Sequence, residues 1–89
     1  MELSEYTKFA QEKIHWLERR FRPIIQNKLF ENDLHRRVQE LWRSCKILQR
    51  KVNLAEEEDD EIRFMYAILK NQDFPNFMSW YEIVGEKIK

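Results

Sequence analysis

The chain has 89 residues, of which 43% are hydrophobic, 36% are charged and 13% are aromatic, and its formal net charge at pH 7 is zero. This balance excludes a largely disordered chain and is typical of one small folded domain, which we place at residues 1–89. No apolar run approaches the roughly 20 residues of a membrane span and the N-terminus lacks the features of a signal peptide, so we expect a cytoplasmic protein without membrane contact.

The first predicted helix begins near Ser4, whose hydroxyl group is a suitable N-cap. Pro23 should interrupt this helix, because proline lacks a backbone N–H and its ring clashes with the preceding turn. We therefore expect a break or kink near Arg22, followed by a short turn over residues 23–30. The apolar stripe of this helix consists of Leu3, Tyr6, Ala10, Ile14, Leu17 and Phe21.

The second predicted helix has the clearest pattern in the chain. Asn32 or Asp33 can cap its start, and Asn53 can end it, since asparagine tolerates the left-handed conformation found at helix ends. Its apolar residues recur at alternating steps of four and three, which only a helix gathers onto one face. Residues 33–52 should therefore form a rod about 30 Å long. The apolar seam of this rod consists of Leu34, Val38, Leu41, Cys45, Leu48 and Val52.

Two more helices are predicted in the C-terminal half. One should begin near Ala55, where the acidic run 56–61 would face the positive end of the helix dipole, and it should stop near Asn71. The other should follow Pro75, which is favoured in the first turn of a helix. These elements predict an all-α fold, a small bundle of three to four helices with the second helix as its central rod. The apolar face of the last helix consists of Phe77, Trp80, Tyr81, Val84 and Ile88.

Several large apolar residues lie off these predicted faces. At 100° per residue, Phe9 and Trp16 share a side of the first helix about 120° from its stripe. Trp42 lies on the flank of the second helix, and Ile47 projects away from its seam. Apolar groups at helical spacing that no core covers indicate an interface, where aromatic residues are enriched. We expect these four residues to bind a protein partner or a second copy of the chain, and packing between the helices is the alternative.

The zero net charge hides a segregation of charge along the chain. Residues 19–51 carry ten Lys or Arg and three acids, whereas residues 56–61 carry six acids and no base. Arg36, Arg43 and Arg50 are seven residues apart and form an arginine stripe opposite the seam. Such a stripe is suited to the phosphates of a nucleic acid, although a solvated face paired with acids of the same fold is the simpler interpretation. The nucleic-acid contacts predicted on this alternative are Arg36, Arg37, Arg43, Lys46, Arg50 and Lys51.

Patterns for catalysis and metal binding are sparse. Cys45 is the only cysteine, which excludes an internal disulfide and a cysteine zinc site. Glu12 and His15 form a Glu-x-x-His pair of the kind that binds di-iron centres, but such centres need two pairs and further carboxylates. The contiguous acids of 56–61 would point in different directions on a helix and would not converge on one cation. We therefore expect no catalytic residue, metal or cofactor.

The sequence thus favours a small non-enzymatic interaction protein. It would act as an adaptor, inhibitor or assembly factor that docks a protein partner through an aromatic patch and its segregated charges. The alternative is a nucleic-acid-binding helical protein that uses the arginine stripe. No motif in the sequence identifies the partner.

Overall fold

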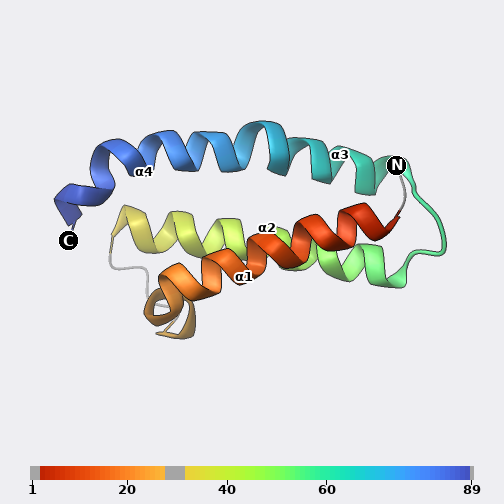
Figure 1. The fold of residues 1–89 in the computed structure, drawn as a ribbon, viewed down its shortest axis with the longest axis horizontal. Coiled ribbons are helices and arrows are strands. Elements are labelled where there is room, and N and C mark those ends of the chain that lie inside the picture. Colours follow the sequence, from red (N-terminus) through yellow and green to blue (C-terminus); the bar gives the residue numbers. More distant parts are fainter. Residues whose placement is uncertain (1–2, 28–31, 89) are drawn as a thin grey trace.

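The protein is all-α in the computed structural model, which describes residues 3–27 and 32–88 (Figure 1). The predicted all-α bundle with a long second helix is confirmed. In the described part of the chain, the last two helices join into one rod, so the fold consists of three rods, each antiparallel to the one before it in the chain. Together they make a body 43 Å long. The elements are α1 (Leu3–Asn27), α2 (Asp33–Leu54), α3 (Asp60–Ile68), the π-helical turn η1 (Leu69–Asp73) and α4 (Phe74–Ile88).

The kink expected in the first helix lies at Phe21, whose φ of −126° and ψ of 33° are not helical. Pro23 follows two residues later and stays within α1. The predicted turn does not begin at Pro23, because proline is well tolerated in the first turn of the helical segment that follows a kink. The last residues of that predicted turn, 28–30, lie outside the described residues.

Helix α2 begins where a capping residue was expected. The side chain of Asn32 accepts a hydrogen bond of 2.9 Å from the backbone N–H of His35. The helix ends at Leu54, two residues beyond the prediction. All six residues of its predicted seam are buried, so the periodicity correctly identified the inner face of the rod.

A buried polar residue on α2, Gln39, supports the end of α1. Its amide nitrogen donates hydrogen bonds of 2.6 Å to the carbonyl oxygen of Ile24 and 3.3 Å to that of Ile25. These carbonyl groups belong to the last turn of α1, where no later residue of the helix is left to donate to them. Gln39 therefore joins the first two rods at their shared end.

The C-terminal rod differs from the prediction in two places. Helix α3 begins at Asp60 and not near Ala55, because Asp59 is the residue that caps it, by accepting a hydrogen bond of 2.8 Å from the N–H of Ile62. The predicted stop near Asn71 is also wrong, since η1 carries the chain directly into α4. A π-turn holds one more residue than an α-turn, which relieves the clash that the Pro75 ring would make in a regular helix.

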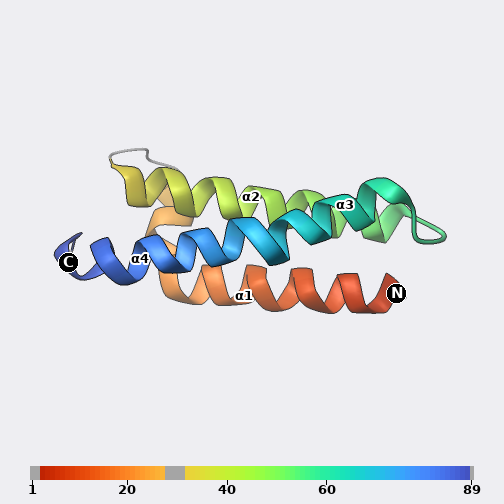
Figure 2. The same cartoon turned by 90° about the horizontal axis from the view of Figure 1, so that it is seen from above.

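The C-terminal rod lies over the boundary between α1 and α2 (Figure 2). The backbone of α1 approaches α2 much more closely than it approaches this rod. Aromatic side chains fill the wider space: the ring centroids of Tyr6 and Tyr66 are 4.9 Å apart, and those of Phe21 and Phe77 are 6.0 Å apart. Cys45 is fully buried beneath the rod, and burial raises the pKa of its thiol to about 12.

Replacing Leu48 by Ala should lower the free energy of unfolding by roughly 2 to 5 kcal/mol, because it leaves a cavity in the core. Leu48 is 0% exposed, whereas Leu54 on the same helix is 77% exposed. Leu54→Ala is therefore the matched control and should change the stability by less than about 0.5 kcal/mol. Urea unfolding followed by circular dichroism measures both values, and equal effects of the two substitutions would contradict this burial pattern.

Candidate functional site

A groove with a mainly apolar lining runs between α1 and the C-terminal rod. Its volume is ≈ 670 Å³. Phe9 and Trp16 lie on one wall and Phe74 on the other, and all three contribute rings to it. We call this hollow the aromatic groove. Its lining consists of Phe9, Glu12, Lys13, Trp16, Lys70, Phe74, Pro75 and Met78.

Phe9 and Trp16 contribute to the core as well as to the groove. The Phe9 ring meets the rings of Tyr66 and Phe74 edge-on, with centroid distances of 4.9 and 6.2 Å. The Trp16 ring meets Phe21 edge-on at 6.0 Å. Both side chains are half-buried, so one edge of each ring packs inward while the remainder lines the groove.

The rim of the aromatic groove carries more positive than negative charge. The Lys13 ammonium nitrogen lies 5.2 Å from the centroid of the Phe74 ring, and that of Lys70 lies 5.5 Å from the Tyr66 ring. Neither lysine forms an ion pair with a residue that the structure describes. Among the described residues that line the groove, Glu12 is the one acid. This arrangement suits a ligand with an apolar face and acidic flanks.

The other two predicted docking residues lie elsewhere. Trp42 is half-buried between α2 and α1, outside the aromatic groove. Its indole nitrogen donates a hydrogen bond of 3.3 Å to the Glu18 carboxylate. Ile47 is 44% exposed and, by helical spacing, lies beside the arginine stripe. The structure therefore gathers Phe9 and Trp16 in one site and leaves Trp42 and Ile47 outside it.

The six predicted nucleic-acid contacts also divide between different surroundings. Arg36, Arg43 and Arg50 are exposed on the outer side of α2, and Arg36 pairs with Asp33 at 3.1 Å. Arg37 and Lys51 have partners on the C-terminal rod, whereas Lys46 is exposed beside the stripe on α2. Arg37 lies over the Trp80 ring at 4.5 Å, Lys51 pairs with Glu61 at 2.6 Å, and Lys46 lies 5.4 Å from the Trp42 ring. The arginine stripe, with Lys46 beside it, remains as a continuous basic surface.

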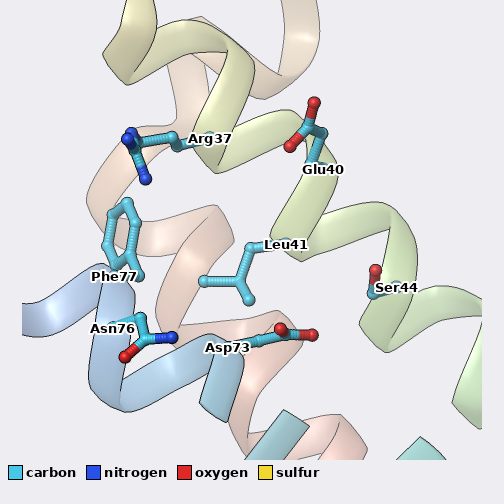
Figure 3. A pocket seen from close by; sticks show the side chains of 7 residues that line it. All are labelled: Arg37, Glu40, Leu41, Ser44, Asp73, Asn76 and Phe77. Carbon is cyan, nitrogen blue, oxygen red and sulfur yellow. The ribbon is translucent and has the colours of Figure 1, made fainter. Parts of the chain in front are cut away.

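A second hollow, smaller and more polar, lies between α2 and the C-terminal rod (Figure 3). Its volume is ≈ 290 Å³. Burial raises the pKa of Asp73, which is the last residue of η1. We call this hollow the polar groove. Its lining consists of Arg37, Glu40, Leu41, Ser44, Asp73, Asn76 and Phe77.

Sequence reasoning missed the contributions of the C-terminal rod to both grooves. Lys70, Phe74 and Met78 are four residues apart, which is the spacing of one helix face. The predicted break near Asn71 separated Lys70 from the other two and hid this signal. Asp73 was overlooked for the same reason, because it was assigned to a loop between helices.

The acidic run supports the fold around the start of α3. Glu58 accepts hydrogen bonds of 2.7 Å from the Tyr6 hydroxyl and 2.8 Å from Arg63, and these bonds lower its pKa to about 2. Asp60 lies 3.5 Å from the same arginine. In residues 3–27 and 32–88, no three His, Cys, Asp or Glu side chains are grouped so that they could hold a metal ion. Glu12 and His15 are both exposed.

No family model, curated protein or solved structure matches this chain in the comparisons with known proteins. None of the helices in the described residues is both long enough and apolar enough to cross a membrane. The two grooves and the arginine stripe are the surface features that could bind a ligand or partner.

Acidification should weaken the fold as Glu58 becomes protonated. The hydrogen bonds from Tyr6 and Arg63 lower its folded-state pKa, so its contribution is present above an unfolded-state pKa of about 4.3 and is lost as the pH falls to about 2. Glu58→Gln should reduce the stability at pH 7 and flatten its fall over that range. Urea unfolding at several pH values measures this effect. Glu57→Gln is the exposed control, and an unchanged acid profile in Glu58→Gln would contradict the assignment.

Proposed function

We propose that this protein is a non-enzymatic interaction protein, an adaptor, inhibitor or assembly factor, that binds an amphipathic helix of a partner protein in the aromatic groove. The observation that carries the proposal is the mainly apolar hollow between two parallel-lying rods, with the rings of Phe9, Trp16 and Phe74 in its walls. A groove between helices is a common receptor for one face of a further helix, which enters with side chains spaced three or four residues apart.

The size and charge of the aromatic groove support this occupant. Its volume of ≈ 670 Å³ falls within the range of about 300–1,000 Å³ that is typical of binding pockets. The apolar side chains of a helix would fill this volume, while acidic residues on the flanks of that helix would meet Lys13 and Lys70. These contacts use Phe9 and Trp16 of the predicted aromatic patch, whereas Lys13 and Lys70 lie outside the charge segments 19–51 and 56–61 of the sequence-based hypothesis.

Trp16 is the best anchor for such a partner. It is half-buried and held by its contact with Phe21, so little conformational freedom remains to be lost on binding. A rigid aromatic residue in the centre of an interface commonly contributes about 2 kcal/mol or more to binding.

Trp16→Ala and Met78→Glu should each abolish capture of partner proteins in a pull-down from the host organism, while circular dichroism remains helical. The first substitution removes the anchor, and the second places a carboxylate in the apolar part of the groove. Lys13→Glu should weaken capture by reversing a charge on the rim. Phe64→Ala is the matched control, since Phe64 is 65% exposed and lies outside the groove. Identical sets of captured proteins for the wild type and for Met78→Glu would overturn the proposal.

Nucleic-acid binding is the second candidate function, because Arg43 and Arg50 are exposed and form no ion pair with a described residue. The zero net charge weighs against it, since nucleic-acid-binding domains generally carry an excess of positive charge.

Reversal of the arginine stripe separates the two functions. Changing Arg36, Arg43 and Arg50 to Glu should leave both the helix content and the capture of partner proteins unchanged, because the stripe lies on the opposite side of α2 from its seam. Capture is measured by pull-down, and a labelled DNA or RNA probe is tested at about 50 mM salt, where phosphate contacts are strong. Probe binding by the wild type that disappears in the reversed variant would instead favour the nucleic-acid function.

A further inference from the structure

The polar groove places opposite charges at separate positions. Arg37 comes from α2 and Asp73 from η1, and Leu41 lies between them in Figure 3. The two charged groups form no ion pair with each other. Asn76 and Ser44 add an amide and a hydroxyl group to the same lining. The groove therefore has one cationic position at Arg37, anionic positions at Asp73 and Glu40, and an apolar surface at Leu41.

Arg37 is fixed in place without being neutralised. Its guanidinium carbon lies 4.5 Å from the centroid of the Trp80 ring, a stacking contact that holds the side chain against the C-terminal rod. Its Nε atom is buried and has no hydrogen-bond partner within the described residues. An arginine in this state retains its capacity to bind an anion through the outer nitrogens of the guanidinium group.

Asp73 is likewise held without a partner. It forms no ion pair or hydrogen bond with any residue of 3–27 or 32–88, although burial disfavours its charged form. The π-turn that carries it places the carboxylate on the side of the C-terminal rod that lines the groove. Asp73 is only partly buried, so its carboxylate remains accessible to a cationic group that enters the groove.

We infer that the polar groove binds a small zwitterion of the amino-acid class, with its carboxylate group on Arg37 and its ammonium group on Asp73. A ligand with only one of these groups would leave the opposite charge of the groove unpaired. Leu41 and Phe77 would contact the hydrocarbon part of the ligand. This site is separate from the aromatic groove and does not depend on the proposed protein docking.

The volume of the polar groove agrees with a ligand of this size. At ≈ 290 Å³ it lies at the lower limit of about 300 Å³ for pockets that take drug-sized molecules. An amino acid is small enough to enter, whereas a nucleotide would extend well outside. Because the groove is open to solvent on one side, the ligand's own side chain would point outward, and the proposal concerns the shared zwitterionic core.

Nuclear magnetic resonance titration with each of the twenty common amino acids tests the inference. We expect at least one amino acid to shift the backbone amide signals of Ser44, Asp73 and Asn76 in a saturable manner. The deaminated and the decarboxylated analogues of that amino acid should bind about tenfold more weakly or worse, since each lacks one charged hydrogen-bonding group. Equal binding of either analogue would overturn the inference, as would the absence of such shifts for all twenty.

Substitutions then test whether Arg37 and Asp73 bind the two charged groups of the ligand. Asp73→Asn and Arg37→Met should each weaken binding by about tenfold or more, and Glu82→Gln and Arg43→Met are the exposed controls that should leave it unchanged. Asp73→Asn should fold as well as the wild type, because it removes a charge that burial disfavours. Unchanged affinity in both groove variants would refute the site. Trp16→Ala should leave amino-acid binding intact, so failure of protein docking and failure of this site are distinguishable.

Discussion

The π-turn η1 is the constraint on which the rest of the structure depends. Pro75 cannot donate a backbone hydrogen bond, and in a regular α-helix its ring would clash with the carbonyl group of Asn71. The wider turn avoids this, since the N–H of Phe74 donates to the carbonyl oxygen of Leu69, five residues earlier. The chain therefore continues from α3 into α4 without leaving the surface of the α1–α2 pair, and both grooves owe one wall to this continuity.

The aromatic layer explains why grooves exist beside so small a core. Because the C-terminal rod lies farther from α1 than α2 does, short side chains would leave a void between them, and large rings fill the distance instead. These rings fill the centre of the space between α1 and the C-terminal rod, and the margins of that space stay open to solvent. The aromatic groove is such an edge, and Phe9 belongs to the layer and the groove at once.

The sequence identified elements most reliably where one helix face meets a continuous core. Helix α2 is covered by both other rods, so its seam repeats without interruption from Leu34 to Val52 and its burial was predicted residue by residue. The start of α3 was not determined locally, because six consecutive acids offer several equivalent caps. Tertiary contacts resolve it: Glu58 is engaged by Tyr6, which leaves Asp59 as the cap. The π-turn was missed because Asn71 and Pro75 are ordinary signals for a helix break.

In the candidate sites, too, residues that spacing marks could be predicted, whereas their grouping in three dimensions could not. Phe9 and Trp16 were recognised because they lie off the stripe of their own helix, a property that spacing alone reveals. Their separation from Trp42 depends on which side of α1 each neighbouring rod occupies, and no local pattern encodes that. Since Phe9 and Trp16 also pack in the core, a substitution at either position changes stability and binding together. Met78 lines the groove but is 37% exposed and is not part of the hydrophobic core, so it separates the two effects better than either ring does.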